Sequence, residues 1–202
     1  MNGTVHTIIG ISTGATLIVT ASDKIPVLSA NPLAPAAFMV AITSGSVFPD
    51  LDLPGRPLGF LGHRGFTHTL VVPALLIGLQ QIIPYGEFTA IPKAFILGFV
   101  FGWLMHIFAD LFQKKGVPLL FPIMPLKCHV HIANIKVKYD KLFLIVYCGV
   151  MLFLISRVGL DELKNKLFSS SPSILFAIVI GVVLLKKFFG KAWKETVRGG
   201  RR

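Results

Sequence analysis

The chain has 202 residues, of which 53% are hydrophobic and only 14% are charged. Soluble domains carry about 25% charged residues, so this composition indicates a membrane protein and excludes an ordinary water-soluble domain. The formal net charge of +11 would suggest nucleic-acid binding in a soluble protein. In a membrane protein it is explained by cytoplasmic loops, which collect Lys and Arg, so no specific nucleic-acid partner is predicted.

Apolar stretches long enough for membrane helices recur along the chain, since a bilayer span needs about 20 mainly apolar residues. In chain order they cover residues 5–20, 33–48, 70–83, 91–112, 142–155 and 172–189. Thr67 or Thr69 can cap the third stretch, and Pro73 fits its first turn. Between the fourth and fifth stretches, residues 127–131 and 135–138 alternate as short strands would.

We therefore predict an all-α, polytopic membrane helical bundle of about six spans. The whole chain, residues 1–202, forms one membrane domain. It consists of metal-site helices and loops in residues 1–125, a helical hairpin in residues 141–190, and a basic tail in residues 191–202.

The distribution of basic residues predicts that both termini are cytoplasmic. With that orientation, the inner segments carry Arg56, Arg64, the lysines of residues 114–141 and the basic residues from Lys186 onward. Fewer basic residues fall in the outer loops: Lys24, Lys93, Arg157, Lys164 and Lys166. The His and Asp residues considered next were not used for this orientation, yet they converge on the inner face.

The fourth stretch carries His106 and Asp110, an i, i+4 pair whose side chains share one helix face and can bind one ion. The second stretch ends at Asp50 and Asp52, which an extended segment would turn to the same side. A helical hydrogen bond and an acidic turn are the structural alternatives. Ionisable groups at a membrane helix are costly and indicate a functional site.

The string Gly62-His63-Arg64-Gly65-Phe66-Thr67-His68-Thr69 is the most specific motif in the chain. Its imidazoles suit zinc, and its guanidinium could hold a phosphate oxygen. His6, at the start of the first stretch, converges on the same face. His129 and His131 could join the site or bind a lipid headgroup. The alternative is a polar loop with incidental histidines.

On these motifs the chain resembles the YdjM-like family of bacterial inner-membrane proteins, described as membrane-bound metal-dependent hydrolases. The resemblance covers roughly residues 1–125 and includes Gly102-x-x-x-His106-x-x-x-Asp110 and the stretch at residues 116–122. The family is distantly similar to zinc-dependent phospholipases C and single-strand-specific zinc nucleases. This resemblance implies that His6, Asp50, Asp52, His63, His68, His106 and Asp110 are metal ligands. Asp52 could instead be a general base.

The sequence thus predicts a hydrolase in the bacterial inner membrane, with its site facing the cytoplasm. Its cofactor would be one to three divalent metal ions, Zn(II) or alternatively Mn(II). Asp52 and Arg64 are the predicted catalytic residues, and the substrate would be a phosphoester of a phospholipid or nucleotide type. The rival is a non-catalytic metal-binding or metal-transporting membrane protein, although the polar residues gather at one end rather than along a path.

Overall fold

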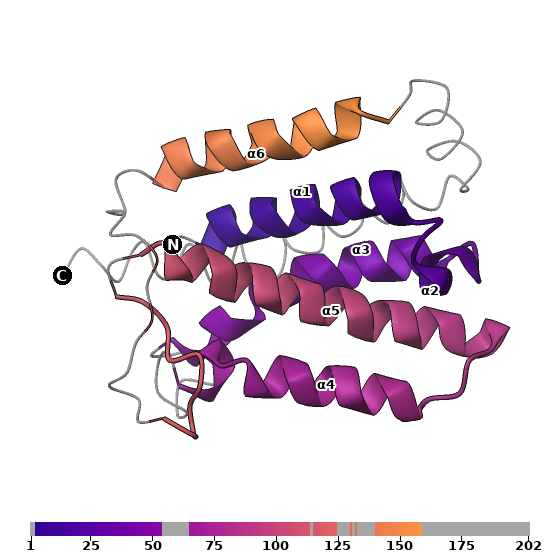
Figure 1. The fold of residues 1–202 in the computed structure, drawn as a ribbon, viewed down its shortest axis with the longest axis horizontal. Helices are drawn as coiled ribbons and strands as arrows, with labels where there is room; N and C mark the ends of the chain where they lie inside the picture. Colours follow the sequence, from indigo (N-terminus) through magenta and orange to yellow (C-terminus); the bar gives the residue numbers. More distant parts are fainter. Residues whose placement is uncertain are drawn as a thin grey trace.

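The computed structural model describes residues 3–53, 65–113, 115–124, 130, 132 and 140–158. In this part of the chain the long helices lie side by side as a bundle (Figure 1). The elements are α1 (Gly3–Ala21), α2 (Pro26–Ser29), α3 (Ala34–Gly45), η1 (Phe48–Asp52), η3 (Phe66–His68), α4 (Val71–Ile82), α5 (Glu87–Leu111) and α6 (Asp140–Ser156), where η1 and η3 are 3-10 helices. The predicted all-α membrane bundle is confirmed.

Three segments of the described chain are long and apolar enough to cross a membrane: Gly3–Ala21, Ala34–Asp52 and Phe88–Leu111. Val71–Ile82 and Leu142–Ser156 are shorter apolar helices. The first five predicted stretches therefore correspond to helices. The sixth, residues 172–189, lies outside the described residues, as does the basic tail. The number of spans and the cytoplasmic position of the termini stay predictions.

Helix α1 is rich in Ser and Thr, which would be costly in a membrane if their hydroxyl groups lacked partners. Those hydroxyls donate to carbonyl oxygens of their own helix one turn earlier. Thr7 donates to Gly3 at 2.9 Å, and Thr16 donates to Ser12 at 2.8 Å. The polar side chains are thus satisfied without solvent, so α1 can lie within the bundle.

Helices α3 and α5 approach closely because glycines stand where they touch. A Cβ atom added at Gly45 would lie 2.1 Å from the carbonyl oxygen of Phe99, and one added at Gly102 would lie 2.0 Å from that of Ile42. Small residues at such contacts are the usual means by which membrane helices pack tightly. This contact fixes the end of α3, where Ser46 lies, against the turn of α5 that carries His106.

Substituting Gly102→Ala is expected to force α3 and α5 apart, because the new methyl group meets rigid backbone. Overpacking of this kind costs about 1–3 kcal/mol of stability. Gly78→Ala in α4 is the matched control, because nothing lies within 4 Å of the added atom. Thermal unfolding in detergent should show a lower Tm for Gly102→Ala only. Equal Tm values for the two variants would contradict the close packing.

The prediction of a threonine cap on α4 was wrong. Neither Thr67 nor Thr69 caps α4, whose N-cap residue is Leu70 without a side-chain cap. The Thr67 hydroxyl instead donates to the Asp52 carboxylate, and that of Thr69 donates to the Phe66 carbonyl oxygen at 3.0 Å. The Thr67 side chain is thus committed to a contact distant in sequence, which local capping rules do not anticipate.

Lys93 does not lie in an outer loop but in the second turn of α5, with only 3% of its surface exposed. Its Nζ lies 4.2 Å from the centre of the Tyr85 ring, a cation–π contact that permits burial.

Asp50 and Asp52 lie on η1 rather than on an extended segment. Of the predicted strands at residues 127–131 and 135–138, only Val130 lies within the described residues. It pairs with Val117 as an isolated antiparallel bridge.

Candidate metal centre

Four elements bring acidic and imidazole side chains together at one end of the bundle. His6 comes from the start of α1, Asp50 and Asp52 from η1, and His68 from η3. Helix α5 supplies His106 and Asp110 in its last turns. All six side chains are buried. The convergence predicted from the sequence is therefore present for every one of these residues, while His63, Arg64, His129 and His131 lie outside the described residues.

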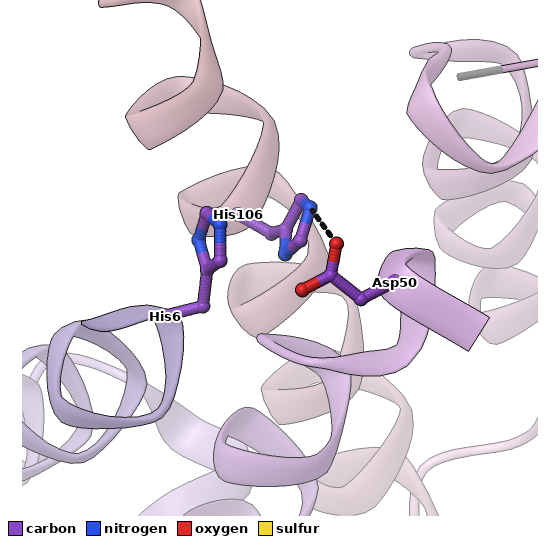
Figure 2. Close-up of side chains that lie close together, drawn as sticks. All are labelled: His6, Asp50 and His106. Carbon is purple, nitrogen blue, oxygen red and sulfur yellow. Dashed lines mark ion pairs between the residues drawn. The ribbon is translucent and has the colours of Figure 1, made fainter. Parts of the chain in front are cut away.

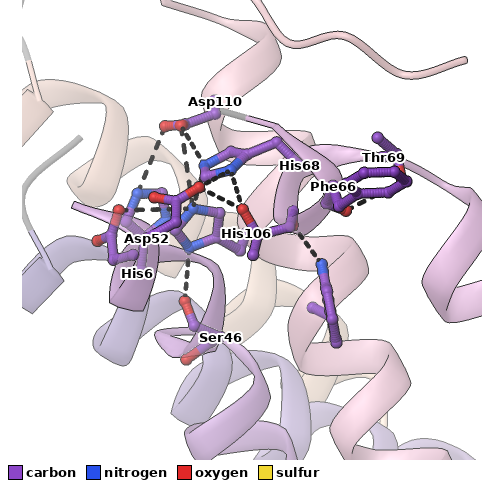
Figure 3. A network of polar contacts seen from close by, with 11 residues as sticks. His6, Ser46, Asp52, Phe66, His68, Thr69, His106 and Asp110 are labelled. Carbon is purple, nitrogen blue, oxygen red and sulfur yellow. Dashed lines mark hydrogen bonds and ion pairs between the residues drawn. The ribbon is translucent and has the colours of Figure 1, made fainter. Parts of the chain in front are cut away.

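His106 is held by the backbone at the end of α3. Its Nδ1 lies 2.8 Å from the carbonyl oxygen of Ser46, to which it donates a hydrogen bond. A histidine that donates from one ring nitrogen presents the lone pair of the other. The Nε2 atom of His106 thus faces the cluster as a potential ligand, as Figure 3 shows.

The donor atoms around His106 lie close to one another. Its Nε2 is 3.3 Å from Nε2 of His68, 3.8 Å from Oδ1 of Asp50 and 3.9 Å from Oδ2 of Asp110. Zinc ligands at 2.0–2.2 Å in a tetrahedral site are separated from one another by about 3.3–3.6 Å. The spacing of these donors is therefore close to that of a coordination shell.

The Asp110 carboxylate connects the histidines. Its Oδ1 lies 3.4 Å from Nε2 of His6, and its Oδ2 lies 3.6 Å from Nε2 of His68. Two sets of donor atoms lie within 4.8 Å of one another: His6, Asp50 and His106, and His68, His106 and Asp110. Because His106 belongs to both sets, the cluster can hold one ion or two adjacent ions.

His6 is the least satisfied member of the cluster. Its ring stacks on that of His106 with 3.8 Å between ring centres, and Figure 2 shows both rings beside Asp50. The side chain is fully buried, and neither ring nitrogen makes a hydrogen bond within the described residues; Nε2 has its 3.4 Å contact with Oδ1 of Asp110, and Nδ1 has no polar contact there. Such orphaned nitrogen atoms are costly in an interior. A cation bound among these donors would remove that cost, so the residues present fit a divalent metal.

Asp52 is arranged differently from Asp50. Its Oδ2 accepts a hydrogen bond from the Thr67 hydroxyl and lies 3.2 Å from Nδ1 of His68. The indole Nε1 of Trp103 donates to the Thr67 carbonyl oxygen at 2.7 Å. These contacts turn Nε2 of His68 toward Asp110 and His106. Asp52 thus has the contacts of a residue that orients a ligand, which differs from its predicted roles as ligand or base.

Three positioning residues were not predicted from the sequence. Ser46 acts through its carbonyl oxygen, so its residue type gives no signal. Thr67 lies within the recognised motif, but its hydroxyl was interpreted as a helix cap. Trp103 offered a signal, because an indole N–H in a membrane helix needs an acceptor.

Comparison with known proteins decides the family. The family model described as "YdjM inner membrane protein" matches residues 1–193. The chain belongs to this family. The inner membrane protein YdjM of Escherichia coli (strain K12) is 42% identical over 89 residues, covering 38% of this chain and 44% of YdjM. The Shigella flexneri YdjM matches to the same extent.

A more distant relative is the protein YfhP of Bacillus subtilis (strain 168). It is 32% identical over 128 residues, covering 58% of this chain and 36% of YfhP. The chain thus matches less than half of the length of each of these relatives. No solved structure matches the chain. Together with the apolar helices, membership in the YdjM family makes the chain a bacterial inner-membrane protein.

Proposed function

We propose that this YdjM-family protein is a membrane-bound, metal-dependent hydrolase that cleaves a phosphoester at the inner membrane face. The observation that carries the proposal is the buried cluster of His6, Asp50, His68, His106 and Asp110 at one end of the bundle. Neutral imidazoles and carboxylates are the ligands that Zn(II) prefers, with Mn(II) as the alternative. Carboxylates gathered in a buried site repel each other, and a bound cation would offset that repulsion.

The proposed roles follow from the contacts of each residue. His6, Asp50, His68, His106 and Asp110 would hold one or two divalent ions. A divalent ion bound there would lower the pKa of a water molecule and offset the charge on a phosphoryl oxygen. Asp52 and Thr67 orient His68, and Ser46 orients His106. Arg64, which precedes η3 in sequence, is proposed to hold a non-bridging phosphoryl oxygen.

An open apolar cavity between α5 and α6 favours a lipid substrate over a soluble nucleotide. It has a volume of about 530 Å³ and is lined only by apolar surface from α5 and α6. Met105, Phe108 and Phe112 line its α5 side, in the same turns that carry His106 and Asp110. A phospholipid could therefore place an acyl chain between α5 and α6 while its phosphate lies at the cluster.

The rival function, metal transport, needs polar groups along a path through the bilayer. In the described helices, the buried hydroxyls of Thr13 and Thr16 donate to carbonyl oxygens of α1 itself, and the Thr13 hydroxyl is also hydrogen-bonded to that of Tyr147. The acidic and imidazole donors lie at one end. This arrangement favours chemistry at a membrane face over passage of an ion.

The test uses the full-length protein in lipid nanodiscs, loaded with Zn(II) or Mn(II). We expect release of a phosphorylated headgroup or phosphate from phospholipid, lost with a chelator and restored by metal. Long-chain lipid should be cleaved faster than a soluble nucleotide phosphodiester if the α5–α6 cavity holds an acyl chain. Metal-loaded protein that cleaves neither substrate, yet moves zinc across proteoliposomes, would establish the rival function.

A further inference from the structure

Asp140, the first residue of α6, is a buried carboxylate outside the cluster already described. Only 5% of its surface is exposed. Neither carboxylate oxygen has a hydrogen-bond partner among the residues that the structure describes. Burying a carboxylate without a partner is expensive, and folded proteins seldom do so without a reason.

Asp140 lies on the face of α6 that packs against α1. Phe143 and Leu144, three and four residues later, and Tyr147, seven residues later, contact a core formed with Val5 and Ile9 of α1. Residues spaced in this way share one side of a helix. The other side of α6 is exposed, as at Leu142 and Ile145. Asp140 therefore belongs to the stripe that faces α1.

The register of the two helices places Asp140 level with His6. Helices α1 and α6 lie side by side and run in the same direction (Figure 1). The hydroxyl groups of Thr13 and Tyr147 are hydrogen-bonded to each other across the contact. Seven residues before Thr13 is His6, and seven before Tyr147 is Asp140. Seven residues make nearly two helical turns, so His6 lies on the same side of α1 as Thr13, and Asp140 lies on the same side of α6 as Tyr147. Both are displaced by roughly 10 Å along their helices from the Thr13–Tyr147 hydrogen bond, and they therefore lie at the same level.

Two buried groups thus lie at the same level of the α1–α6 contact, and among the described residues neither Nδ1 of His6 nor the Asp140 carboxylate has a hydrogen-bond partner. A water molecule that bridges the two would give each of them a hydrogen-bond partner. Histidines that bind metals commonly give their second ring N–H to a carboxylate, which fixes the ring and strengthens the ligand.

We propose that Asp140 is a positioning residue of the metal centre. Through a water molecule, its carboxylate accepts the hydrogen bond of Nδ1–H of His6, the ring nitrogen that does not face Asp110, and so holds the imidazole in place. This inference rests on the proposed metal site and extends that site onto α6. Helix α6 would then contribute to metal affinity as well as to packing, although it supplies no direct ligand.

The test measures the Zn(II) affinity of full-length protein in detergent by competition with a chromophoric chelator. Asp140→Asn should weaken binding by about 10- to 100-fold, the usual cost of losing such a partner, without changing the number of ions bound. Asp23→Asn is the matched control, an exposed Asp in the turn that follows α1. Asp140→Glu should recover part of the lost affinity.

A double-mutant cycle shows whether Asp140 acts through His6. In a His6→Ala background, Asp140→Asn should cause no further loss of Zn(II) affinity. Wild-type affinity in Asp140→Asn, or additive losses in the double variant, would overturn the inference. Protein that binds Zn(II) with this coupling but hydrolyses no phosphoester would refute the proposed hydrolase alone. Wild-type protein that binds no metal would refute both.

Discussion

Purified Asp110→Ala and His68→Ala proteins are expected to contain no bound metal and to have no phosphoesterase activity. The Asp110 carboxylate contacts His6 through one oxygen and His68 and His106 through the other. Its removal therefore takes away a carboxylate that contacts all three histidines of the cluster. Loss of a residue that only orients a ligand costs 10- to 100-fold in affinity, so loss of this ligand should cost more than about 100-fold. Elemental analysis after gel filtration measures the metal content.

Asp23→Ala is the matched control for these variants, because Asp23 is an exposed carboxylate in the turn that follows α1. It should keep the metal content and activity of the wild type. Circular dichroism and elution volume show whether each variant retains its helices and size. Folded Asp110→Ala and His68→Ala proteins that keep wild-type metal content would contradict the site, as would wild-type protein that takes up no metal when supplied with it.

The helices could be predicted because a helix that spans a bilayer needs about 20 mainly apolar residues, and such long apolar stretches rarely have another cause. The described helices follow the predicted stretches, and α5 begins at Glu87 rather than near Ile91. The first turn of α5 contains Glu87 and Thr89, polar residues that a search for apolar stretches leaves out. The tight approach of α3 and α5 could not be predicted, since glycines are common in membrane helices wherever they lie.

The site could be predicted as far as its residues carry side-chain chemistry. His6, Asp50, Asp52, His68, His106 and Asp110 converge as their positions along the predicted helices suggested. Asp50 lies beside His106, whereas Asp52 lies beside His68. This difference arises because both residues lie on the 3-10 helix η1, a conformation that their spacing of two residues does not predict. Asp140 was placed before the fifth predicted stretch, and only the pairing of α6 with α1 brings it level with His6.

The contacts of Asp52 lead to an expected effect on metal affinity. If Asp52 orients His68, Asp52→Asn should weaken Zn(II) binding by about 10- to 100-fold while the number of bound ions stays unchanged. The reason is that an ionised carboxylate only accepts hydrogen bonds and therefore fixes the proton of His68 on Nδ1, whereas an amide can also donate. Competition titration with a chelator measures the affinity, and elemental analysis at saturating zinc measures the number of ions.

Thr67 provides the matched test of the same arrangement, because its hydroxyl donates to the Asp52 carboxylate and lies 3.0 Å from Nδ1 of His68. Thr67→Val removes the hydroxyl at nearly constant shape and should weaken Zn(II) binding in the same direction as Asp52→Asn, whereas Thr67→Ser should retain it. Fewer bound ions in Asp52→Asn at saturating zinc would identify Asp52 as a ligand. Unchanged affinity with lost turnover would identify it as a base, since a base acts on the substrate or water without holding the metal.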